Sequence, residues 1–323
     1  MEGGVTETVH LYGSETEDVS LVGERLREIA REHHALLGET LAYVFETEGK
    51  RIRPALVMLS GKLGTYDVDH LVTLAASLEV VHSATLVHDD TIDEALTRRG
   101  LETVSAIWDP KIAVLVGDFL FAQSAHLAAQ LNSVRIVELF SETVMAMSSG
   151  ELRQYASSQS LVIDEADYFQ RITGKTATLF AACCEGAAIV TDQSEERAAA
   201  LGAFGLNLGL AFQIVDDVLD FRGTEQKLGK PAGNDLRQGT ITLPAILYAQ
   251  SQPSGSAWLA DLKSGENMER LIRSVIESDC LNSAMRRAHE YADAACLALS
   301  LFPASDAKNA LEQLARRVTT REY

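Results

Sequence analysis

Apolar residues recur along most of the chain at spacings of three and four, which is the period of an amphipathic or buried α-helix. The pattern is clearest in "LVTLAASLEVVHSATLVHDD", "IAVLVGDFLFAQSAHLAAQL" and "AALGAFGLNLGLAFQIVDDVLDF". Alternating patterns typical of strands are nearly absent, and the six prolines lie mostly outside these windows. The pattern therefore predicts an all-α protein built from many long helices.

The helical pattern begins near Leu21. Residues 1–20 are polar, acidic and contain several glycines, which predicts a mobile acidic N-terminal tail. Later interruptions such as "GTYDVD", "VTDQSEE" and "QSQPSGS" lack the length and composition of an interdomain linker, and no fixed-period repeat is present. We therefore expect residues 21–323 to form a single all-α domain.

Composition narrows the class of protein. With 323 residues and 46% hydrophobic content the chain can bury a large core. No uninterrupted apolar run approaches the ~18 residues of a membrane span, and the N-terminus lacks the basic and apolar regions of a signal peptide. We therefore expect no integral membrane segment and a cytoplasmic location. The four cysteines show no metal-ligand spacing and are expected to be reduced thiols.

The net charge of -18 argues against nucleic-acid binding, because the phosphate backbone requires an excess of lysine and arginine on at least one face. Any anionic ligand would have to be bound by local clusters of basic residues. Such clusters occur at Lys50, Arg51 and Arg53, at Arg98 and Arg99, at Lys175, and at Lys227 and Lys230.

A group of three carboxylates interrupts one of the apolar helices. In "LVHDDTIDEALTRRG", residues 86–100, a turn of about 100° per residue places Asp89 and Asp93 on one helix face with Asp90 beside them. Such a cluster requires a cation or raised pKa values, and oxygen ligands favour Mg²⁺ over zinc. A solvated acidic helix end is the alternative, but apolar neighbours on both sides favour an embedded site.

The same spacing occurs a second time, in "FQIVDDVLDF", which carries Asp216, Asp217 and Asp220. If the two helices face each other, their carboxylates would line a mouth that holds several divalent ions. Metal ions combined with fixed guanidinium and ammonium groups fit a diphosphate ligand. Each basic cluster alone could equally be a solvated surface, but their joint occurrence with two aspartate motifs favours a diphosphate site.

The sequence "TGKT" suggests a nucleotide-binding P-loop, but that motif requires another glycine five residues before Gly174. Phe169 occupies this position, and no strand precedes it. The P-loop interpretation therefore fails, and Lys175 and Thr176 need another explanation.

Together these segments resemble the trans-isoprenyl diphosphate synthases, or polyprenyl synthetases. The resemblance extends from about Leu21 to the C-terminus and rests on "GKRIRP", "HSATLVHDDTIDEALTRRG", "GD" at Gly117, "GKTA", "FQIVDDVLD" and "GKPAGNDL". It implies an isoprenoid synthase fold of long antiparallel helices around a deep central cavity, normally in a homodimer. It also implies head-to-tail condensation of an allylic diphosphate with isopentenyl diphosphate, with release of pyrophosphate.

The resemblance also assigns roles to individual residues. Metal binding falls mainly to Asp89, Asp93 and Asp216, with Asp90, Asp217 and Asp220 as further ligands, directly or through water. About three Mg²⁺ ions are implied, with Mn²⁺ as a substitute. The residues implied to contact the allylic diphosphate or the reacting centre are Arg98, Lys175, Gln213 and Lys230. Those implied for a metal-free isopentenyl diphosphate site are Lys50, Arg53, His82 and Arg99.

The expected reaction begins when metal ions and basic groups draw electrons toward the leaving pyrophosphate, in a cavity that excludes water. The isopentenyl double bond then attacks the allylic cation, and the proton is lost to the pyrophosphate. The carbonyl of Lys175, the hydroxyl of Thr176 and the amide oxygen of Gln213 are expected to stabilise the cation. No protein general base is required.

Small residues precede the first aspartate motif. Ala84 and Thr85 would leave a product tunnel open, which predicts a product between hexaprenyl and decaprenyl diphosphate. Short-chain members of the family tend to carry bulky aromatic residues there. A farnesyl or geranylgeranyl diphosphate synthase remains the alternative if another side chain closes the tunnel; the candidates are Leu78, Val81, Phe119 and Phe121.

One position departs from the family pattern, since many relatives carry lysine where this chain has Thr240. The sequence also leaves open a small partner subunit. A terpene cyclase is disfavoured by the intact "DDVLD" and "GKRIRP", and a head-to-head synthase by the spacing of its acidic motifs. A non-catalytic synthase subunit is disfavoured because both aspartate motifs are complete.

Overall fold

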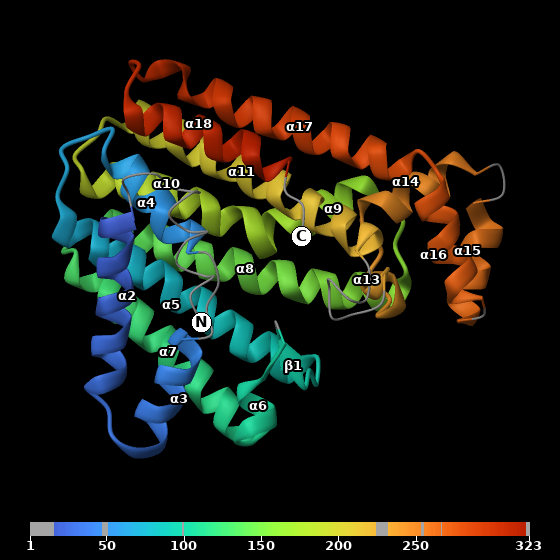
Figure 1. Cartoon of the computed structure of the whole chain (residues 1–323), viewed down its shortest axis with the longest axis horizontal. Helices are drawn as coiled ribbons and strands as arrows, with labels where there is room; N and C mark the ends of the chain where they lie inside the picture. Colours follow the sequence, from blue (N-terminus) through green and yellow to red (C-terminus); the bar gives the residue numbers. More distant parts are fainter. Residues whose placement is uncertain are drawn as a thin grey trace. The chain divides into compact units, whose positions relative to one another are not determined.

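The computed structural model describes residues 16–46, 51–98, 100–223, 232–252, 255–265 and 267–320. Most of these residues are helical and only two short strands occur among them, which confirms the predicted all-α class (Figure 1). The chain forms two compact units, each assembled from several stretches of sequence. Among the described residues, the first comprises those within 16–144, 182–202 and 299–314, and the second those within 145–181, 203–298 and 315–320. The single domain expected for residues 21–323 stays a prediction.

The described part of the first unit before residue 131 contains six helices and a small hairpin. Its elements are α2 (Thr16–Arg31), α3 (Ala35–Glu46), α4 (Ile52–Gly61), α5 (Val68–Ile92), β1 (Thr97–Arg98), β2 (Leu101–Glu102), α6 (Val104–Ile107) and α7 (Pro110–Gln130). The helices α5 and α7 lie side by side (Figure 1). Both helices have an N-capping aspartate, since the side chains of Asp67 and Asp109 accept hydrogen bonds from first-turn N–H groups.

The first described helix begins earlier than the sequence pattern indicated. Helix α2 starts at Thr16, so residues 16–20 of the expected tail are helical. Val19 and Val22 are both buried, and Asp18 accepts a hydrogen bond from Tyr66 and pairs with Lys62. Tyr66 and Lys62 are far from Asp18 in the sequence, so these contacts stabilise a first helical turn that its polar composition did not predict. Residues 1–15 of the expected tail lie outside the described residues.

Four of the remaining described helices have residues in both units. These are α8 (Val134–Ser160), α10 (Thr178–Val190), α11 (Glu195–Arg222) and the C-terminal α18 (Asp306–Val318), whereas η3 (Leu299–Leu301) belongs to the first unit. Each unit has its own core of fully buried side chains. Leu56, Met58 and Leu120 belong to the core of the first unit, and Phe204 and Phe221 to that of the second.

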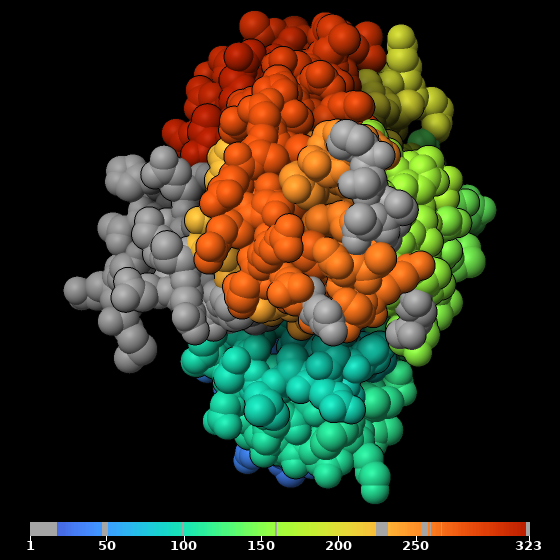
Figure 2. Space-filling model, turned by 90° about the vertical axis from the view of Figure 1, so that its right-hand side faces the viewer, coloured from blue at the N-terminus to red at the C-terminus, as the bar shows by residue number. Residues whose placement is uncertain are grey.

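The elements that lie wholly in the second unit are mostly short. They are α9 (Glu165–Ile172), the π-helix η2 (Thr173–Ala177), α13 (Asn234–Arg237), α14 (Leu243–Ser251), α15 (Gly255–Ser264), α16 (Met268–Glu277) and α17 (Cys280–Ala298). Helix α14 packs against α17, and α15 against α16. Figure 2 shows the orange side chains of this C-terminal group gathered on one face.

Three helices are apolar enough to meet the criteria of a membrane span. By length and composition alone α5, α7 and α11 qualify, since each contains an 18-residue stretch with no more than two charged residues. This differs from the expectation that no apolar stretch reaches such a length. Burial inside the protein covers 67% of that stretch in α5, 39% in α7 and 56% in α11. The expected absence of an integral membrane segment therefore stays a prediction.

The cysteines of the structure form no disulfide, and Cys183, Cys184 and Cys280 are buried. Burial raises the pKa of the Cys184 thiol to about 12. A buried thiol with a raised pKa is a poor nucleophile. The expectation of reduced thiols agrees with this geometry.

Candidate functional site

The first aspartate motif coincides with the end of α5. Asp93 is the C-cap, and Glu94 follows with a left-handed φ of 50°. The N–H of Ala95 bonds to the carbonyl of Asp90 at 2.9 Å, and the N–H of Glu94 to that of Thr91 at 3.4 Å. This is a Schellman motif, and it turns the chain sharply immediately after the motif.

The three carboxylates of this motif lie in different surroundings. Asp89 is partly exposed and Asp93 is exposed, one helical turn apart on the same face. Asp90 is buried at 7% exposure, and Arg98 Nε donates to its two oxygens at 2.7 and 2.9 Å. Arg98 stands in β1, and the turn after α5 brings it back to Asp90. The structure thus joins two predicted site residues, Asp90 and Arg98, in a partly buried ion pair.

A small cavity of about 60 Å³ borders this ion pair. Its wall includes Asp90, Arg98, Tyr43 and Val104, from α5, β1, α3 and α6. Tyr43 donates a hydrogen bond to the carbonyl of Glu102 at 2.6 Å, which ties α3 to the hairpin.

His88 packs α5 against α7, a role the sequence did not reveal. Its Nε2 lies 3.1 Å from the carbonyl oxygen of Val114, which can only accept, so Nε2 donates. A Cβ on Gly117 would lie 2.0 Å from the same nitrogen. Gly117, part of the "GD" segment, is therefore required by this close approach. Phe121 adds a ring contact to His88, with centroids 5.6 Å apart.

The expected isopentenyl diphosphate site is described in part. Arg53 in α4 and His82 in α5 are both partly exposed. Arg51 has a left-handed φ of 51°, donates to the carbonyl of Phe45, and lies 4.0 Å from the buried Glu79. Two further candidates for this site, Lys50 and Arg99, lie outside the described residues.

The candidate residues for product length differ in accessibility. Val81 and Ala84 are fully buried, whereas Thr85 is partly exposed. The Thr85 hydroxyl donates to the carbonyl of His82 at 2.7 Å, so it is satisfied within the helix. Of these three residues, only Thr85 presents accessible surface.

The second aspartate motif belongs to α11 in the second unit. Asp216 and Asp220 are partly exposed, and an oxygen of Asp220 accepts from the N–H of Asp235 at 3.3 Å. Asp217 is buried at 3% exposure. Both motifs therefore share one pattern, a buried second aspartate between two more accessible ones.

Asp217 receives hydrogen bonds on both oxygens. Tyr168 donates to Oδ2 at 2.6 Å and Gln213 Nε2 donates to Oδ1 at 2.9 Å. Burial raises the pKa of the Asp217 carboxyl to about 8, and Asp235 adds to the rise, whereas these two hydrogen bonds oppose it. On its other side Gln213 accepts from the hydroxyl of Thr176 at 2.7 Å. The structure thus connects Thr176, Gln213 and Asp217, all predicted site residues, and adds Tyr168 at the Asp217 end, which the sequence did not reveal.

Lys175 and Thr176 belong to the π-helix η2, a rare element that recurs at functional sites. Two glycines let η2 approach α8 closely. A Cβ on Gly174 would lie 2.8 Å from the carbonyl oxygen of Ala146, and one on Gly150 would lie 2.6 Å from the backbone nitrogen of Lys175. The Lys175 ammonium pairs with Glu151 of α8 at 2.6 Å. Close packing and this ion pair fix the position of the lysine.

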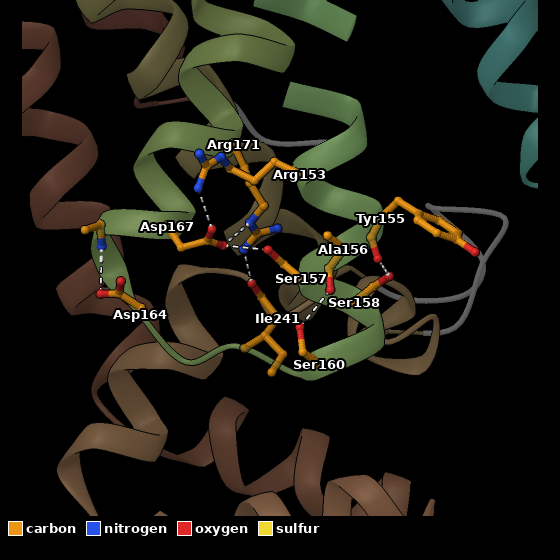
Figure 3. A network of polar contacts seen from close by, with 11 residues as sticks. Arg153, Tyr155, Ala156, Ser157, Ser158, Ser160, Asp164, Asp167, Arg171 and Ile241 are labelled. Atoms are coloured by element: carbon orange, nitrogen blue, oxygen red, sulfur yellow. Dashed lines mark hydrogen bonds and ion pairs between the residues drawn. The ribbon is translucent and has the colours of Figure 1, made fainter. Parts of the chain in front are cut away.

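A partly buried polar network supports α9 (Figure 3). Asp167 accepts from Ser157 at 2.8 Å, from Arg171 at 3.1 Å and from Arg153 at 3.2 Å. Arg171 is only 4% exposed and also donates to the carbonyl of Ile241 at 2.8 Å. The network therefore joins α8, α9 and the segment before α14, and it holds the helix that carries Tyr168.

These networks went unrecognised for different reasons. The spacing of Asp167 and Arg171, four residues apart on a strongly amphipathic helix, was a usable signal for an ion pair. Nothing local marked Tyr168, whose partner is 49 residues away. Among the described residues, no group of three or more His, Cys, Asp or Glu side chains is arranged to hold a metal ion. The remaining candidate, Lys230, lies outside the described residues.

Carboxylate pairs one helical turn apart, as at Asp89 and Asp93, supply the oxygen donors that Mg²⁺ prefers. With fewer than three such groups gathered among the described residues, a bound ion would need further oxygens from a ligand or water. Phosphate oxygens would complete such a coordination shell, and Mg²⁺ is usually bound in this manner. The donor chemistry therefore fits a divalent ion that binds together with a diphosphate.

Comparison with known proteins identifies the family. The polyprenyl synthetase family model matches residues 34–278. Heptaprenyl diphosphate synthase component 2 of Bacillus subtilis (strain 168) is 35% identical over 315 residues, which cover 97% of this chain and 90% of that protein. Octaprenyl diphosphate synthase of Haemophilus influenzae is 36% identical over 293 residues, 89% of each chain.

A solved structure leads to the same family. The polyprenyl synthase of Caulobacter crescentus, complexed with calcium and isoprenyl diphosphate, superposes with a TM-score of 0.87 at 36% identity, covering 99% of both chains. The isoprenoid synthase fold and the resemblance inferred from the motifs are thereby confirmed. The chain belongs to the polyprenyl synthetase family.

Proposed function

We propose that the protein is a trans-polyprenyl diphosphate synthase, which joins isopentenyl diphosphate head-to-tail to an allylic diphosphate and releases pyrophosphate. The prenyltransferase class follows from family membership. The observation that carries the proposal is that both DDxxD motifs are complete, at the same spacing and at the same kind of helix position. Each presents two accessible aspartates around a buried one.

The metal ions are proposed to be about three Mg²⁺, held mainly by Asp89, Asp93 and Asp216, with Mn²⁺ as a substitute. When bound, they would neutralise the charge that develops on the leaving diphosphate. Asp220 is a further ligand in this proposal. Asp90 and Asp217 are already engaged by protein donors, which favours an indirect contribution from these two residues.

The protein's own groups would bind and orient the two substrates. For the allylic diphosphate we propose Arg98, Lys175 and Lys230, and for the isopentenyl diphosphate Lys50, Arg53, His82 and Arg99. The ion pair of Lys175 with Glu151 supports this, because it holds the ammonium beside a closely packed π-helix. A diphosphate would compete with Glu151 for that ammonium.

The reaction breaks the allylic C–O bond, and its electron pair leaves with the pyrophosphate. The isopentenyl double bond supplies the electrons for the new C–C bond, and the proton lost from the adjacent carbon goes to pyrophosphate. The oxygens of Gln213 and Thr176, together with the carbonyl of Lys175, would stabilise the cation through their dipoles. Many relatives carry lysine where this chain has Thr240, whose N–H bonds to the carbonyl of Asp235. We propose that the chain lacks one phosphate contact at this position, because threonine has no charged group.

The product is proposed to lie between hexaprenyl and decaprenyl diphosphate. The names of the Bacillus subtilis and Haemophilus influenzae relatives, and the small accessible residue Thr85, support this range. A farnesyl or geranylgeranyl diphosphate synthase is the second candidate. Phe119, which packs on His33 at 4.9 Å between ring centroids, is a bulky side chain on α7 that would favour it.

We further propose a cytoplasmic homodimer. The word "component" in the name of the Bacillus subtilis relative also suggests a small partner subunit as an alternative. Light scattering of the purified protein distinguishes these states. A monomer that gains activity only when a second protein is added would overturn the homodimer.

The test is an assay of purified protein with labelled isopentenyl diphosphate and farnesyl diphosphate, with Mg²⁺ and with a chelator. We expect Mg²⁺-dependent pyrophosphate release and a product of hexaprenyl length or longer on chromatography. A dominant geranylgeranyl product would favour the short-chain candidate. Absence of pyrophosphate release with allylic primers of every length would contradict the enzymatic proposal.

A further inference from the structure

Four side chains of the second unit form an unbroken line of hydrogen bonds. Tyr168 of α9 bonds to Asp217 at 2.6 Å, Asp217 to Gln213 at 2.9 Å, and Gln213 to Thr176 of η2 at 2.7 Å. Tyr168 is 1% exposed and Asp217 3%, so water does not compete at that end. Hydrogen bonds shielded in this way are strongly orienting.

The direction of the line follows from the donors and acceptors. Gln213 Nε2 donates to Oδ1 of Asp217 and the Tyr168 hydroxyl bonds to Oδ2, so the amide nitrogen of Gln213 faces Asp217 whether the carboxyl is ionised or carries its proton on Oδ2. An amide has one N–H₂ end and one oxygen end, so the oxygen of Gln213 must point toward Thr176. The only hydroxyl proton of Thr176 is then directed at that oxygen. The end of the line therefore presents oxygen lone pairs and no proton.

We propose that Tyr168 is a positioning residue, which fixes the orientation of the Gln213 amide through Asp217 and thereby the polarity of Thr176. This inference rests on the proposed function, in which the oxygens of Gln213 and Thr176 stabilise an allylic cation. A reversed amide would present an N–H₂ group, whose dipole repels a cation. Tyr168 itself does not touch the substrate in this proposal.

The surroundings of Tyr168 are built to hold it in place. Its ring packs edge-on against Phe169 at 5.2 Å between centroids, and the Arg171 guanidinium lies 5.7 Å from its centroid. Arg171 is anchored by Asp167 and by the carbonyl of Ile241. Phe169 and Arg171 therefore hold the ring of Tyr168, so removal of the hydroxyl alone should leave the ring in place.

The first experiment compares Tyr168→Phe with the wild type in steady-state assays. We expect kcat to fall about 10- to 100-fold, as for other partners that orient a reacting group, with little change in KM for either substrate. Tyr291→Phe is the matched control, since Tyr291 belongs to the same aromatic cluster, 5.6 Å from Phe169. It should behave like the wild type. Equal kcat for Tyr168→Phe and Tyr291→Phe would overturn the inference.

The second experiment reverses the line. Asp217→Asn keeps the shape but can donate to the oxygen of Gln213, which would turn its N–H₂ end toward Thr176. We expect kcat to fall at least as far as in Tyr168→Phe, while calorimetry shows unchanged binding of pyrophosphate with Mg²⁺. Loss of that binding would instead make Asp217 a metal ligand, and would overturn its role as the connection between Tyr168 and Gln213.

A double-mutant cycle tests whether the residues act as one unit. Because Tyr168 acts only through Gln213 in this inference, Tyr168→Phe combined with Gln213→Leu should lose no more kcat than Gln213→Leu alone. Multiplied losses would show independent roles and contradict the inference. Circular dichroism and thermal unfolding of every variant identify a folding defect, and Asp217→Asn remains informative if Tyr168→Phe folds poorly. A wild type without activity would refute the proposed function, whereas an active wild type with an unaffected Tyr168→Phe refutes this inference alone.

Discussion

The imidazole of His88 occupies the space that a side chain on Gly117 would need. A Cβ at Gly117 would lie 2.0 Å from His88 Nε2, and the same nitrogen donates to the carbonyl of Val114. His88 directly precedes Asp89, so this close approach between α5 and α7 lies next to the first aspartate of the motif. The contact gives a structural reason for a histidine at position 88 and a glycine at position 117.

Substitution of Gly117 by alanine should therefore destabilise the protein. Because the added methyl overlaps the imidazole, we expect a loss of about 1–3 kcal/mol in the free energy of unfolding, measured in urea. Gly23→Ala is the matched control, since its Cβ would meet only Arg27 at 3.5 Å within α2. That change should be neutral or stabilising by up to about 1 kcal/mol. Equal stability of the two variants would contradict the packing role of His88.

Asp89→Ala tests the metal assignment. We expect turnover to fall by orders of magnitude, because the loss removes a carboxylate that is proposed to hold Mg²⁺ on the leaving diphosphate. The side chain is partly exposed, so the far-ultraviolet circular dichroism and the thermal midpoint should change little. Asp69→Ala, at the other end of the same helix, is the control and should retain activity. Pyrophosphate release provides the measurement, and near-normal release from Asp89→Ala would reject the assignment.

Variants of the ion pair between Asp90 and Arg98 should distinguish effects on stability from effects on activity. Arg98→Ala removes the guanidinium that donates to both oxygens of a buried carboxylate, and should cost about 1–3 kcal/mol of unfolding free energy. Adding Asp90→Asn removes the uncompensated charge and should restore much of that loss. Activity should not recover, because Arg98 is also proposed to bind the allylic diphosphate. Recovery of both properties together would show that Arg98 acts only through Asp90.

Asp167 should make stability depend on pH (Figure 3). Burial favours the neutral acid, but hydrogen bonds from Ser157 and Arg153 and the charge of Arg171 outweigh it and hold the pKa of Asp167 below its ordinary value. The unfolded chain then binds the proton more readily, so the stabilisation is present above the unfolded pKa of about 4 and is lost as pH falls through the folded pKa. The difference in unfolding free energy between wild type and Asp167→Asn should be constant from pH 5 to 7, roughly, and shrink below about pH 4. A difference that grows on acidification would have the wrong sign.

The sequence was sufficient where function depends on local spacing. The aspartates recur at i and i+4, and helical geometry alone places them on one face. Which aspartates are buried could not be predicted from the sequence. Asp90 and Asp217 look locally like the other aspartates of their motifs, but they are bonded by Arg98 and Tyr168 from other elements. The bend after α5 was also hidden, because glutamate rather than glycine adopts the left-handed conformation at position 94. Tertiary contacts therefore divide each motif into accessible and buried carboxylates.

Thr85 and Ala84 should respond differently to enlargement. Thr85 is partly exposed, so Thr85→Phe can place its ring outside the core and shorten the proposed product tunnel. We expect products of this variant to shift toward farnesyl and geranylgeranyl diphosphate on chromatography, with stability close to the wild type. Ala84 is fully buried, so Ala84→Phe should overpack the core and cost about 1–3 kcal/mol or more of unfolding free energy. Unchanged products from a folded Thr85→Phe would remove Thr85 from the tunnel wall and assign the control of length to another residue.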